Sequence, residues 1–161
     1  GTFYATPGAN DGLGVVPQTI GATWGFGYYI NGGTAQLGGY QIDLFYDLNP
    51  AAGTPLADLG RIDLDAALNG GGGGALTLFQ DAQNLHSAFF STGVPGVVFA
   101  PAMAFNANAA GEYSLMLRVR DQAGNDVATS AILINVPEPA SLALVGLALV
   151  GVGAASRRRR A

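Results

Sequence analysis

Apolar and polar positions alternate strictly in the second half of the chain, which predicts a β-hairpin. Over 112–120, apolar residues occupy every second position from Tyr113 to Val119. A period of two predicts a strand with one buried and one solvated face. A second run, over 127–136, is rich in β-branched residues, and the six residues between the runs include the Gly, Asn and Asp that turns require.

Shorter runs of the same character predict further strands earlier in the chain, at 23–30, 40–48, 61–65, 75–79, 86–90, 97–99 and 102–105. Six to nine short strands with turn signals between them indicate an antiparallel β-sandwich. The composition agrees, because 25 Gly, 8 Pro and only 11% charged residues are too rich in turn formers for a mostly helical protein. A hydrophobic share of 49% is too high for intrinsic disorder. We therefore expect a mainly β domain.

Charge divides the chain at residue 136. Residues 1–136 hold ten acidic residues and three arginines, a net charge of −7, whereas 137–161 hold one acidic residue and four arginines. An acidic body with three scattered cations cannot neutralise a phosphate backbone, so we expect no nucleic-acid binding. Cysteine is absent, which excludes a disulfide framework, a thiolate zinc site and a cysteine nucleophile.

The segment 140–155 contains no charged residue and is followed at once by four arginines. As a helix it would span ~24 Å at ~1.5 Å per residue, a little short of the ~30 Å hydrocarbon core. It could cross a thinned bilayer with its arginines reaching the interface. Clustered arginines stay on the cytoplasmic side, so the body would lie outside. The alternative, a buried core helix, would show a polar stripe, which this segment lacks.

Two prolines stand directly before this apolar segment, in the order Val136, Pro137, Glu138, Pro139. Each proline fixes its own φ and disfavours helix in the residue before it. We therefore expect an extended, accessible stretch between body and helix, which is the form of backbone that a protease engages. The chain starts at Gly1 without a leader segment, and we interpret this start as truncated or processed, so it does not argue against secretion.

Proline, glutamate and proline, then a short apolar helix, then terminal arginines resemble the PEP-CTERM sorting signal of Gram-negative bacteria. The resemblance covers 137–161 and implies cleavage near Pro137, Glu138 and Pro139 by exosortase, an integral membrane enzyme. It implies an inner-membrane stage with the body in the periplasm and a cell-surface or extracellular destination. The expected membrane anchor comprises Ala140, Leu142, Leu144, Val145, Leu147, Leu149, Val150 and Val152. The expected cytoplasmic stop is Arg157, Arg158, Arg159 and Arg160.

The body shows a weaker resemblance. Gly111, Glu112 and Tyr113 open a strand near its end, which resembles the tyrosine corner of immunoglobulin-like sandwiches, where a Tyr hydroxyl returns to upstream backbone. Ala109 stands where that pattern usually has an acidic residue. The body also resembles domains that often precede this sorting signal and have no assigned chemistry. We therefore expect an immunoglobulin-like antiparallel sandwich over 1–136 and a sorting signal over 137–161.

Carboxylates are the main candidates for chemistry in the body. Asp43 and Asp47 would share one face of a strand, as would Asp63 and Asp65. Such pairs could bind Ca²⁺ or hydrolyse glycosides, and a turn with Asp121, Asn125 and Asp126 offers another cation site. The D-x-[DN]-x-[DN]-G loop of calcium sites is absent, however, and alternating acids are typical of a solvated strand face. We expect solvated acids and no bound metal or other cofactor.

Other candidate sites have weaker support. His86 could be combined with Asp81 and Ser87 or Ser91 into a triad, but neighbours in one strand rarely reach that geometry and no G-x-S-x-G elbow is present. The five glycines after Asn69 lack the Lys and Ser or Thr of a phosphate-binding loop, which predicts only a flexible loop.

Aromatic residues of the first predicted strand could form a sugar platform. Trp24, Phe26 and Tyr28 share one face, which we expect to point into the core, and Tyr29 should be exposed. The sequence leads to a non-enzymatic exported protein with a structural or adhesive body, in the envelope or an exopolysaccharide matrix. A polysaccharide-binding module with the same signal is the alternative, and a secreted hydrolase is the least favoured reading.

Overall fold

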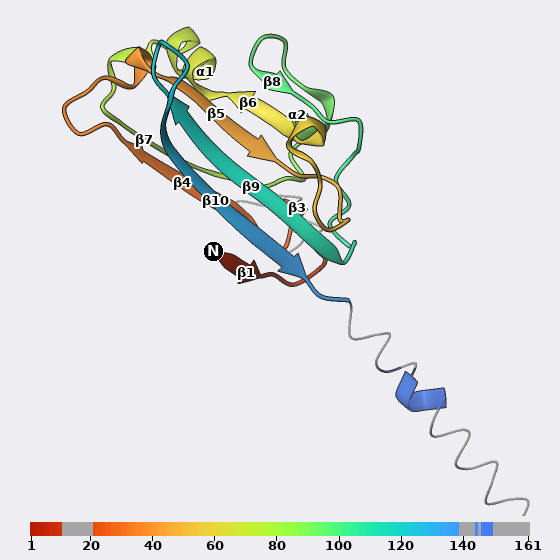
Figure 1. The fold of residues 1–161 in the computed structure, drawn as a ribbon. Coiled ribbons are helices and arrows are strands. Elements are labelled where there is room, and N and C mark those ends of the chain that lie inside the picture. Colours follow the sequence, from red (N-terminus) through yellow and green to blue (C-terminus); the bar gives the residue numbers. More distant parts are fainter. Residues whose placement is uncertain (11–20, 139–143, 145, 150–161) are drawn as a thin grey trace, which may run out of the picture.

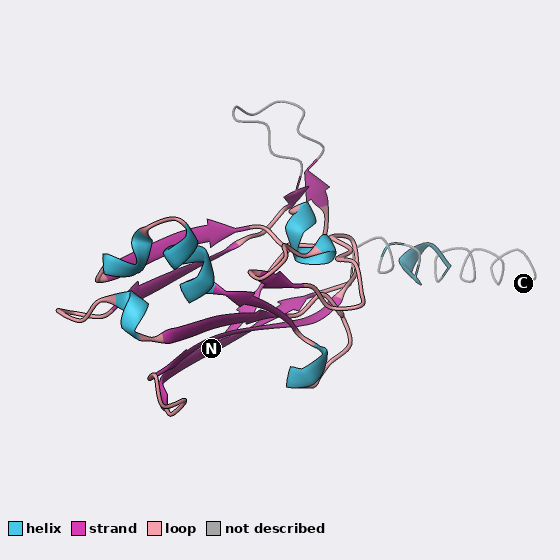
Figure 2. Ribbon diagram, turned by 90° about the horizontal axis from the view of Figure 1, so that it is seen from above, coloured by secondary structure: helices cyan, strands magenta, loops and turns pink. Residues whose placement is uncertain are grey.

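A computed structural model describes residues 1–10, 21–138, 144 and 146–149 of the chain. Strands dominate, as Figures 1 and 2 show, and the helices are short and lie around the strand ends. The mainly β prediction is therefore confirmed. The strands are β1 (Thr2–Tyr4), β2 (Ala9–Asn10), β3 (Gly21–Ala22), β4 (Phe26–Asn31), β5 (Gln41–Tyr46), β6 (Gly60–Asp63), β7 (Leu78–Gln83), β8 (Val98–Phe99), β9 (Gly111–Arg120) and β10 (Asp126–Val136).

Two α-helices and three 3₁₀ turns connect these strands. The helices are α1 (Leu64–Gly70) and α2 (Ala88–Thr92), and the 3₁₀ turns are η1 (Leu37–Gly39), η2 (Leu56–Asp58) and η3 (Gly73–Ala75). Each helix has a recognisable boundary. The Asp63 carboxylate accepts the Ala66 N–H at the start of α1, and Gly93, at a φ of 77°, ends α2 by donating its N–H to the Phe89 carbonyl.

Six strands form the main sheet in the order β1-β10-β9-β5-β6-β8. The predicted hairpin is its centre, because β9 and β10 pair antiparallel along nearly their whole length, with one irregularity at Asp126 to Ala128. The short strand β1 adds to the outer edge of β10 in parallel, so the first residues of the chain lie beside the end of the body. Strands β4 and β7 form a separate antiparallel pair, and β2 and β3 form another.

The core lies between the main sheet and the β4–β7 pair, which lies behind β9 and β10 in Figure 1. Strand β5 contributes alternate residues to it, including Ile42, Leu44 and Tyr46. The ring of Phe90 packs edge-on against Tyr46, with centroids 4.8 Å apart, and lies 6.2 Å from Phe26 of β4. The Tyr46 hydroxyl donates to the Phe90 carbonyl at 2.8 Å. Helix α2 thus reaches the core chiefly through Phe90, which touches both layers, and Phe89 packs against the edge of the same core.

Tyr113, at the start of β9, makes the backbone contact that its motif predicts. Its hydroxyl donates to the Ala109 carbonyl at 3.2 Å, and its ring packs against Trp24 and Phe105 with centroids 5.7 and 5.5 Å away. The carbonyl of residue 109 needs no acidic side chain to accept this bond. The alanine at that position therefore does not prevent the corner.

Several predicted strand boundaries are wrong for local reasons. The strand predicted over 61–65 stops at Asp63 because this residue caps α1, which takes in Asp65 and the first of the five consecutive glycines. The remaining glycines lead into η3, so the flexible loop predicted there is largely helical. The strand predicted over 75–79 lies instead at 78–83.

Two other predicted strands are absent from the described residues. The run 86–90 leads into helix α2. Gly93 ends this helix, and such a C-terminal glycine is a helix signal that the period-two pattern does not include. The run 102–105 forms no regular element. Strands β1, β2 and β3 were not predicted, because two or three residues are too short for a periodic signal.

We expect Gly60→Ala to destabilise the body by about 1–3 kcal/mol, because a methyl group there would overlap the ring of buried Tyr46. Gly39→Ala is the matched control, since no atom lies within 4 Å of the added carbon. Urea unfolding of the full chain in one fixed detergent, followed by Trp24 fluorescence, measures both. Equal unfolding midpoints for the two variants would contradict the close packing of Gly60 against the Tyr46 ring.

Candidate functional site

The junction between body and C-terminal segment is the first candidate site. Strand β10 ends at Val136, which pairs with Gly111 of β9 and is 3% exposed. Pro137 and Glu138 follow outside regular structure and are exposed. The accessible stretch expected from Val136 onward therefore begins only at Pro137, because the Val136 side chain belongs to the core.

Strand β10 is held on both sides up to this junction. On one side, Glu112 pairs with Asn135. On the other, Tyr4 pairs with the same Asn135, and the Ala5 N–H donates to its carbonyl at 3.0 Å. The adjoining loop is also tight, because a side chain at Gly111 would overlap the carbonyl of Pro50. The chain is therefore fixed until one residue before the exposed prolyl-glutamyl pair.

Several predicted residues lie outside the described part of the chain. They are Pro139 of the cleavage motif, five of the eight anchor residues (Ala140, Leu142, Val145, Val150 and Val152) and the cytoplasmic stop, Arg157 to Arg160. Leu144, Leu147 and Leu149 are described, and all three are helical and exposed. Within the described part of the chain, no helix is both long enough and apolar enough to cross a membrane.

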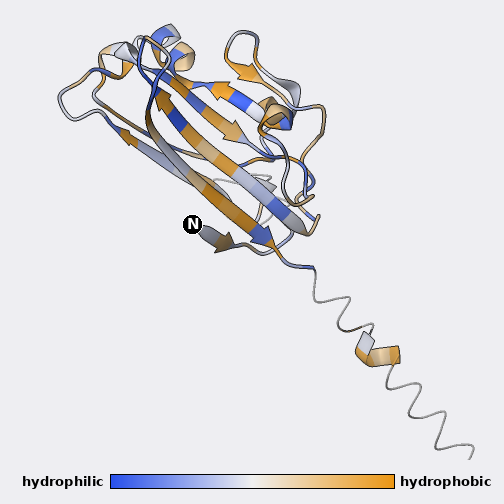
Figure 3. Cartoon of the chain, viewed as in Figure 1, coloured by the Kyte–Doolittle hydropathy of each residue, from blue (hydrophilic) through white to orange (hydrophobic). Residues whose placement is uncertain are grey.

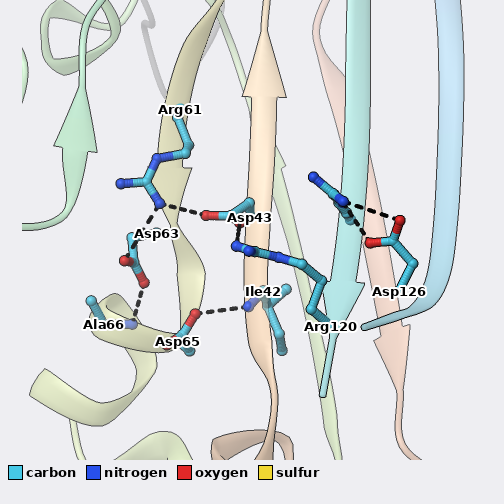
Figure 4. A network of polar contacts seen from close by, with 9 residues as sticks. Ile42, Asp43, Arg61, Asp63, Asp65, Ala66, Arg120 and Asp126 are labelled. Carbon is cyan, nitrogen blue, oxygen red and sulfur yellow. Dashed lines mark hydrogen bonds and ion pairs between the residues drawn. The ribbon is translucent and has the colours of Figure 1, made fainter. Parts of the chain in front are cut away.

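Asp43 is the centre of a charged network on the outer face of the main sheet (Figure 4). One of its carboxylate oxygens accepts from Arg61 of β6 at 2.7 Å, and the other accepts from Arg120 of β9 at 2.6 Å. The Asp43 side chain is 3% exposed, so the solvated acid expected here is instead buried under two guanidinium groups. Arg61 also lies over the ring of Phe99, 4.2 Å from its centroid.

The third arginine of the body pairs at the start of β10. Arg118 donates two hydrogen bonds to Asp126, at 2.6 and 3.0 Å, in the bidentate geometry typical of guanidinium and carboxylate. These bonds lower the pKa of Asp126. Arg61, Arg118 and Arg120 thus all form ion pairs with carboxylates of the same sheet. The remaining acidic residues therefore give the body a negative electrostatic potential.

Asp63 and Asp65 do not form the strand-face pair that was predicted, because α1 begins between them. Asp63 caps the helix, and Asp65 accepts the Ile42 N–H of β5 at 2.7 Å. Burial raises the pKa of Asp65. Both carboxylates therefore hold backbone N–H groups in place.

Asp47 is buried as well, and its carboxylate has hydrogen-bond partners different from those of Asp43. Its Oδ1 accepts the Asn49 N–H at 2.8 Å, while no hydrogen-bond donor reaches its Oδ2 among the described residues. Burial raises the pKa of Asp47, and its negative charge adds to the burial that raises the pKa of Tyr113. Asp43 and Asp47 share no hydrogen-bond partner, and both are buried instead of being the solvated acids that were expected.

The triad considered around His86 is not assembled either. The backbone N–H of His86 donates to the side chain of Asn84. Among the described residues, no hydrogen bond joins the His86 imidazole to Asp81, Ser87 or Ser91. Asn84 has the larger role, because its side chain also binds the Ala22 N–H and the carbonyls of Ala22 and Trp24. It fixes the start of β4, a role that no sequence motif indicated.

The turn considered for calcium is closed by its own hydrogen bonds. Asp121 accepts from the backbone N–H and side-chain amide of Asn125, at 2.8 and 2.9 Å, and these bonds lower the pKa of Asp121. Asp126 faces Arg118 instead. In the described ranges, no three residues of the types His, Cys, Asp or Glu gather as a metal site would require.

The aromatic residues of β4 are distributed as the alternation predicts. Phe26 is buried, Trp24 and Tyr28 are packed against the core, and Tyr29 is 55% exposed. Tyr28 packs on Phe79 of β7, with centroids 5.9 Å apart. Only Tyr29 of this group is therefore available to a ligand.

Comparison with known families bears on the junction. A family model for the PEP-CTERM protein-sorting motif matches residues 135–160. The chain carries a PEP-CTERM sorting motif. This motif is an exosortase-targeted sorting signal and implies export and membrane-associated sorting, with exosortase as the processing partner. No curated protein and no solved structure matches the chain.

The match begins inside the folded body. Asn135 belongs both to β10 and to the PEP-CTERM match, which starts there. The body and the motif therefore overlap by the last two residues of a paired strand, and no flexible spacer separates them.

We expect Asp43→Asn to destabilise the body by about 3 kcal/mol, since it removes the anionic partner of two partly buried guanidinium groups. Asp126→Asn is the matched control and should cost clearly less, because the side chain of Asp126 is 53% exposed. Urea unfolding in one detergent measures both variants. A loss for Asp43→Asn no larger than the loss for Asp126→Asn would contradict a central role for Asp43.

Proposed function

We propose that this protein is exported with its C-terminal segment held in the inner membrane and its body in the periplasm. Exosortase then cuts the exposed stretch, and the body passes to the cell surface or the extracellular matrix. The observation that carries this proposal is the sorting motif at 135–160, whose Pro137 and Glu138 are exposed directly after a buried strand end. The apolar run 140–155 and the arginines after it supply the membrane stop.

The charge pattern and the core packing both separate two functional parts of the chain at residue 136. Residues 1–136 act as the body and 137–161 as the sorting signal. We place the cut after Pro137 or a few residues beyond it, because Val136 packs in the core and pairs with β9, so a protease could reach the Val136 backbone only by opening the end of β10. The released body then keeps both edges of β10 paired.

The strand order supports an immunoglobulin-like sandwich for the body. Strands β5, β9 and β10 are neighbours in the main sheet, as strands C, F and G are in that fold, and β4 with β7 corresponds to B with E. The Tyr113 hydroxyl bond to the Ala109 carbonyl corresponds to the tyrosine corner at the start of strand F. Such a sandwich is a rigid carrier for surfaces rather than an active site by itself.

The body itself has a structural or adhesive role without catalysis. Its carboxylates support this view, because Asp43, Asp63 and Asp65 satisfy arginines or backbone N–H groups of the fold. A glycoside hydrolase would typically need two carboxylates facing one cleft. The carboxylates just described face the protein's own groups instead.

Intact-mass spectrometry of the mature protein from its host tests the sorting proposal. We expect a body that ends at Pro137 or a few residues beyond, without the arginine run. Changing Pro137→Ala, Glu138→Gln and Pro139→Ala together should leave the full-length chain in the membrane fraction. The matched control changes exposed Pro55→Ala and Asp58→Asn and should be processed normally. A mature protein that retains Arg157 to Arg160 in the wild type would contradict processing.

A second candidate function, binding of a neutral polysaccharide, is favoured by one hollow on the body. This hollow, of about 360 Å³, lies between the end of β4 and the start of β10. Exposed Tyr29 and half-buried Tyr40 line it together with the polar side chains of Asn31, Thr129 and Ser130. An aromatic ring beside amide and hydroxyl groups can pack against the apolar face of a sugar while binding its hydroxyls.

A glycan array with the full chain, with and without EDTA, tests this candidate. We expect binding that EDTA does not change and that Tyr29→Ala weakens roughly tenfold, the ~1.4 kcal/mol of a lost aromatic contact. Tyr4→Ala, which removes an exposed tyrosine outside this hollow, is the matched control. Silence on the array under both conditions would leave only the structural role.

A further inference from the structure

The end of the body at which the chain enters the sorting signal carries a mostly apolar, partly aromatic surface without a cation. Tyr4, Pro50, Ala52 and Pro137 line one shallow hollow there. Phe3 precedes Tyr4 in β1 and lines, together with Tyr4, a neighbouring hollow. We call these five residues the exit surface. Tyr4 is 81% exposed and Phe3 is 55% exposed, so two large aromatic side chains face outward directly beside the junction.

The position of these residues is fixed by the sheet. Strand β1 runs parallel to β10, with Phe3 opposite Ile134 and Tyr4 opposite Asn135. The Ala5 N–H bond to the Asn135 carbonyl extends this pairing to the end of the strand. Figure 1 shows β1 beside the arrowhead of β10, where the chain leaves the body. The aromatic pair is therefore held at the junction by backbone hydrogen bonds.

The spacing to the apolar segment is short. Three residues, 137 to 139, separate Val136 from the start of the apolar run at Ala140. Extended, they cover about 10 Å at ~3.3 Å per residue, and one headgroup layer is ~5–8 Å thick by the difference between total and hydrocarbon thickness. A body tethered this closely must sit at the membrane surface with its junction end toward the lipid.

We propose that the exit surface rests in the interfacial layer of the membrane that holds the sorting signal, with Phe3 and Tyr4 as its anchors. This inference rests on the proposed membrane stage. Aromatic side chains with one polar edge favour the membrane–water interface. Two of them bind a bilayer weakly when free, but a tether of three residues keeps their effective concentration at the surface high.

Charge supports a neutral lipid surface as the partner. The charged residue in the hollow of the exit surface is Glu112, and Glu138 follows Pro137. The arginines of the body are engaged elsewhere, with Arg118 and Arg120 near the far end of β9 from Gly111. Attraction to anionic lipid therefore contributes nothing at this end, and the contact depends on aromatic and apolar side chains.

The contact has two consequences for sorting. While the tether is intact, the body cannot tumble freely, and Pro137 and Glu138 are held at the depth where a membrane enzyme works. Once the chain is cut, the tether no longer raises the effective concentration, so the weak aromatic contact dissociates and the body leaves. The exit surface thus acts before cleavage and does not retain the product.

The absence of cysteine from the chain allows a direct test. The full chain with Ala52→Cys, labelled with a fluorophore, is reconstituted into phosphatidylcholine vesicles whose headgroups carry a quencher. A label at Thr34→Cys, on the exposed turn after β4, is the distal control. We expect strong quenching at position 52 and little at position 34, with no increase when anionic lipid is added.

The deciding comparison removes the anchors. Phe3→Ser with Tyr4→Ser, in the Ala52→Cys background, should lose most of the quenching, and Tyr4→Ser alone should lose part of it. Tyr29→Ser, which removes an exposed tyrosine at the other end of the body, should leave the quenching unchanged. Unfolding followed by Trp24 fluorescence shows that the variants remain folded.

Other outcomes overturn the inference in distinct ways. Unchanged quenching in the folded anchor variants would mean that the tether alone brings position 52 to the surface. Quenching that grows with anionic lipid would indicate electrostatic contact, and quenching seen only in membranes with exosortase would indicate a protein partner. Failure of the full chain to float with vesicles would instead reject the proposed membrane stage itself.

Discussion

Strand β10 hydrogen-bonds to a neighbour on each side until its last residues, and the PEP-CTERM motif starts within those residues. This pairing determines where the folded protein ends. Val136 is part of the core, and the next residue is exposed. Any enzyme that acts on the motif therefore meets a rigid sheet edge on one side and an accessible prolyl-glutamyl stretch on the other.

The same constraint brings the two ends of the body together. Strand β1 is only three residues long and could not persist alone, but β10 supplies a complete row of partners for it. As a result, Phe3 and Tyr4 stand beside the point where the chain departs. Figure 3 shows that β10 is hydrophobic just before its hydrophilic arrowhead. The end of β10 is thus the place where the sorting signal starts, where Phe3 and Tyr4 lie and where the last core residue, Val136, is buried.

The charged network of the outer face lies away from this junction. Asp43 ties β5 to β6 and β9 through two arginines, and Arg118 ties β9 to β10 through Asp126. Four strands of the main sheet are joined across their outer face, while Tyr46, Phe90 and Phe26 join the two layers inside. This arrangement uses all three cations of an acidic body for stability.

Sequence periodicity and composition by themselves determined the mainly β class, the β9–β10 hairpin, the exposure of Tyr29 and the sorting motif, because each depends on residues close together in the chain. Tertiary structure alone decided the partners of Asp43, which lie 18 and 77 positions away, and the pairing of Tyr4 with Asn135. It also decided that the predicted strand at 86–90 gives way to helix α2, whose Phe90 packs in the core between the two layers. A pattern of alternating residues specifies which side of a strand is buried, but the neighbour of that strand depends on packing energies summed over the whole fold.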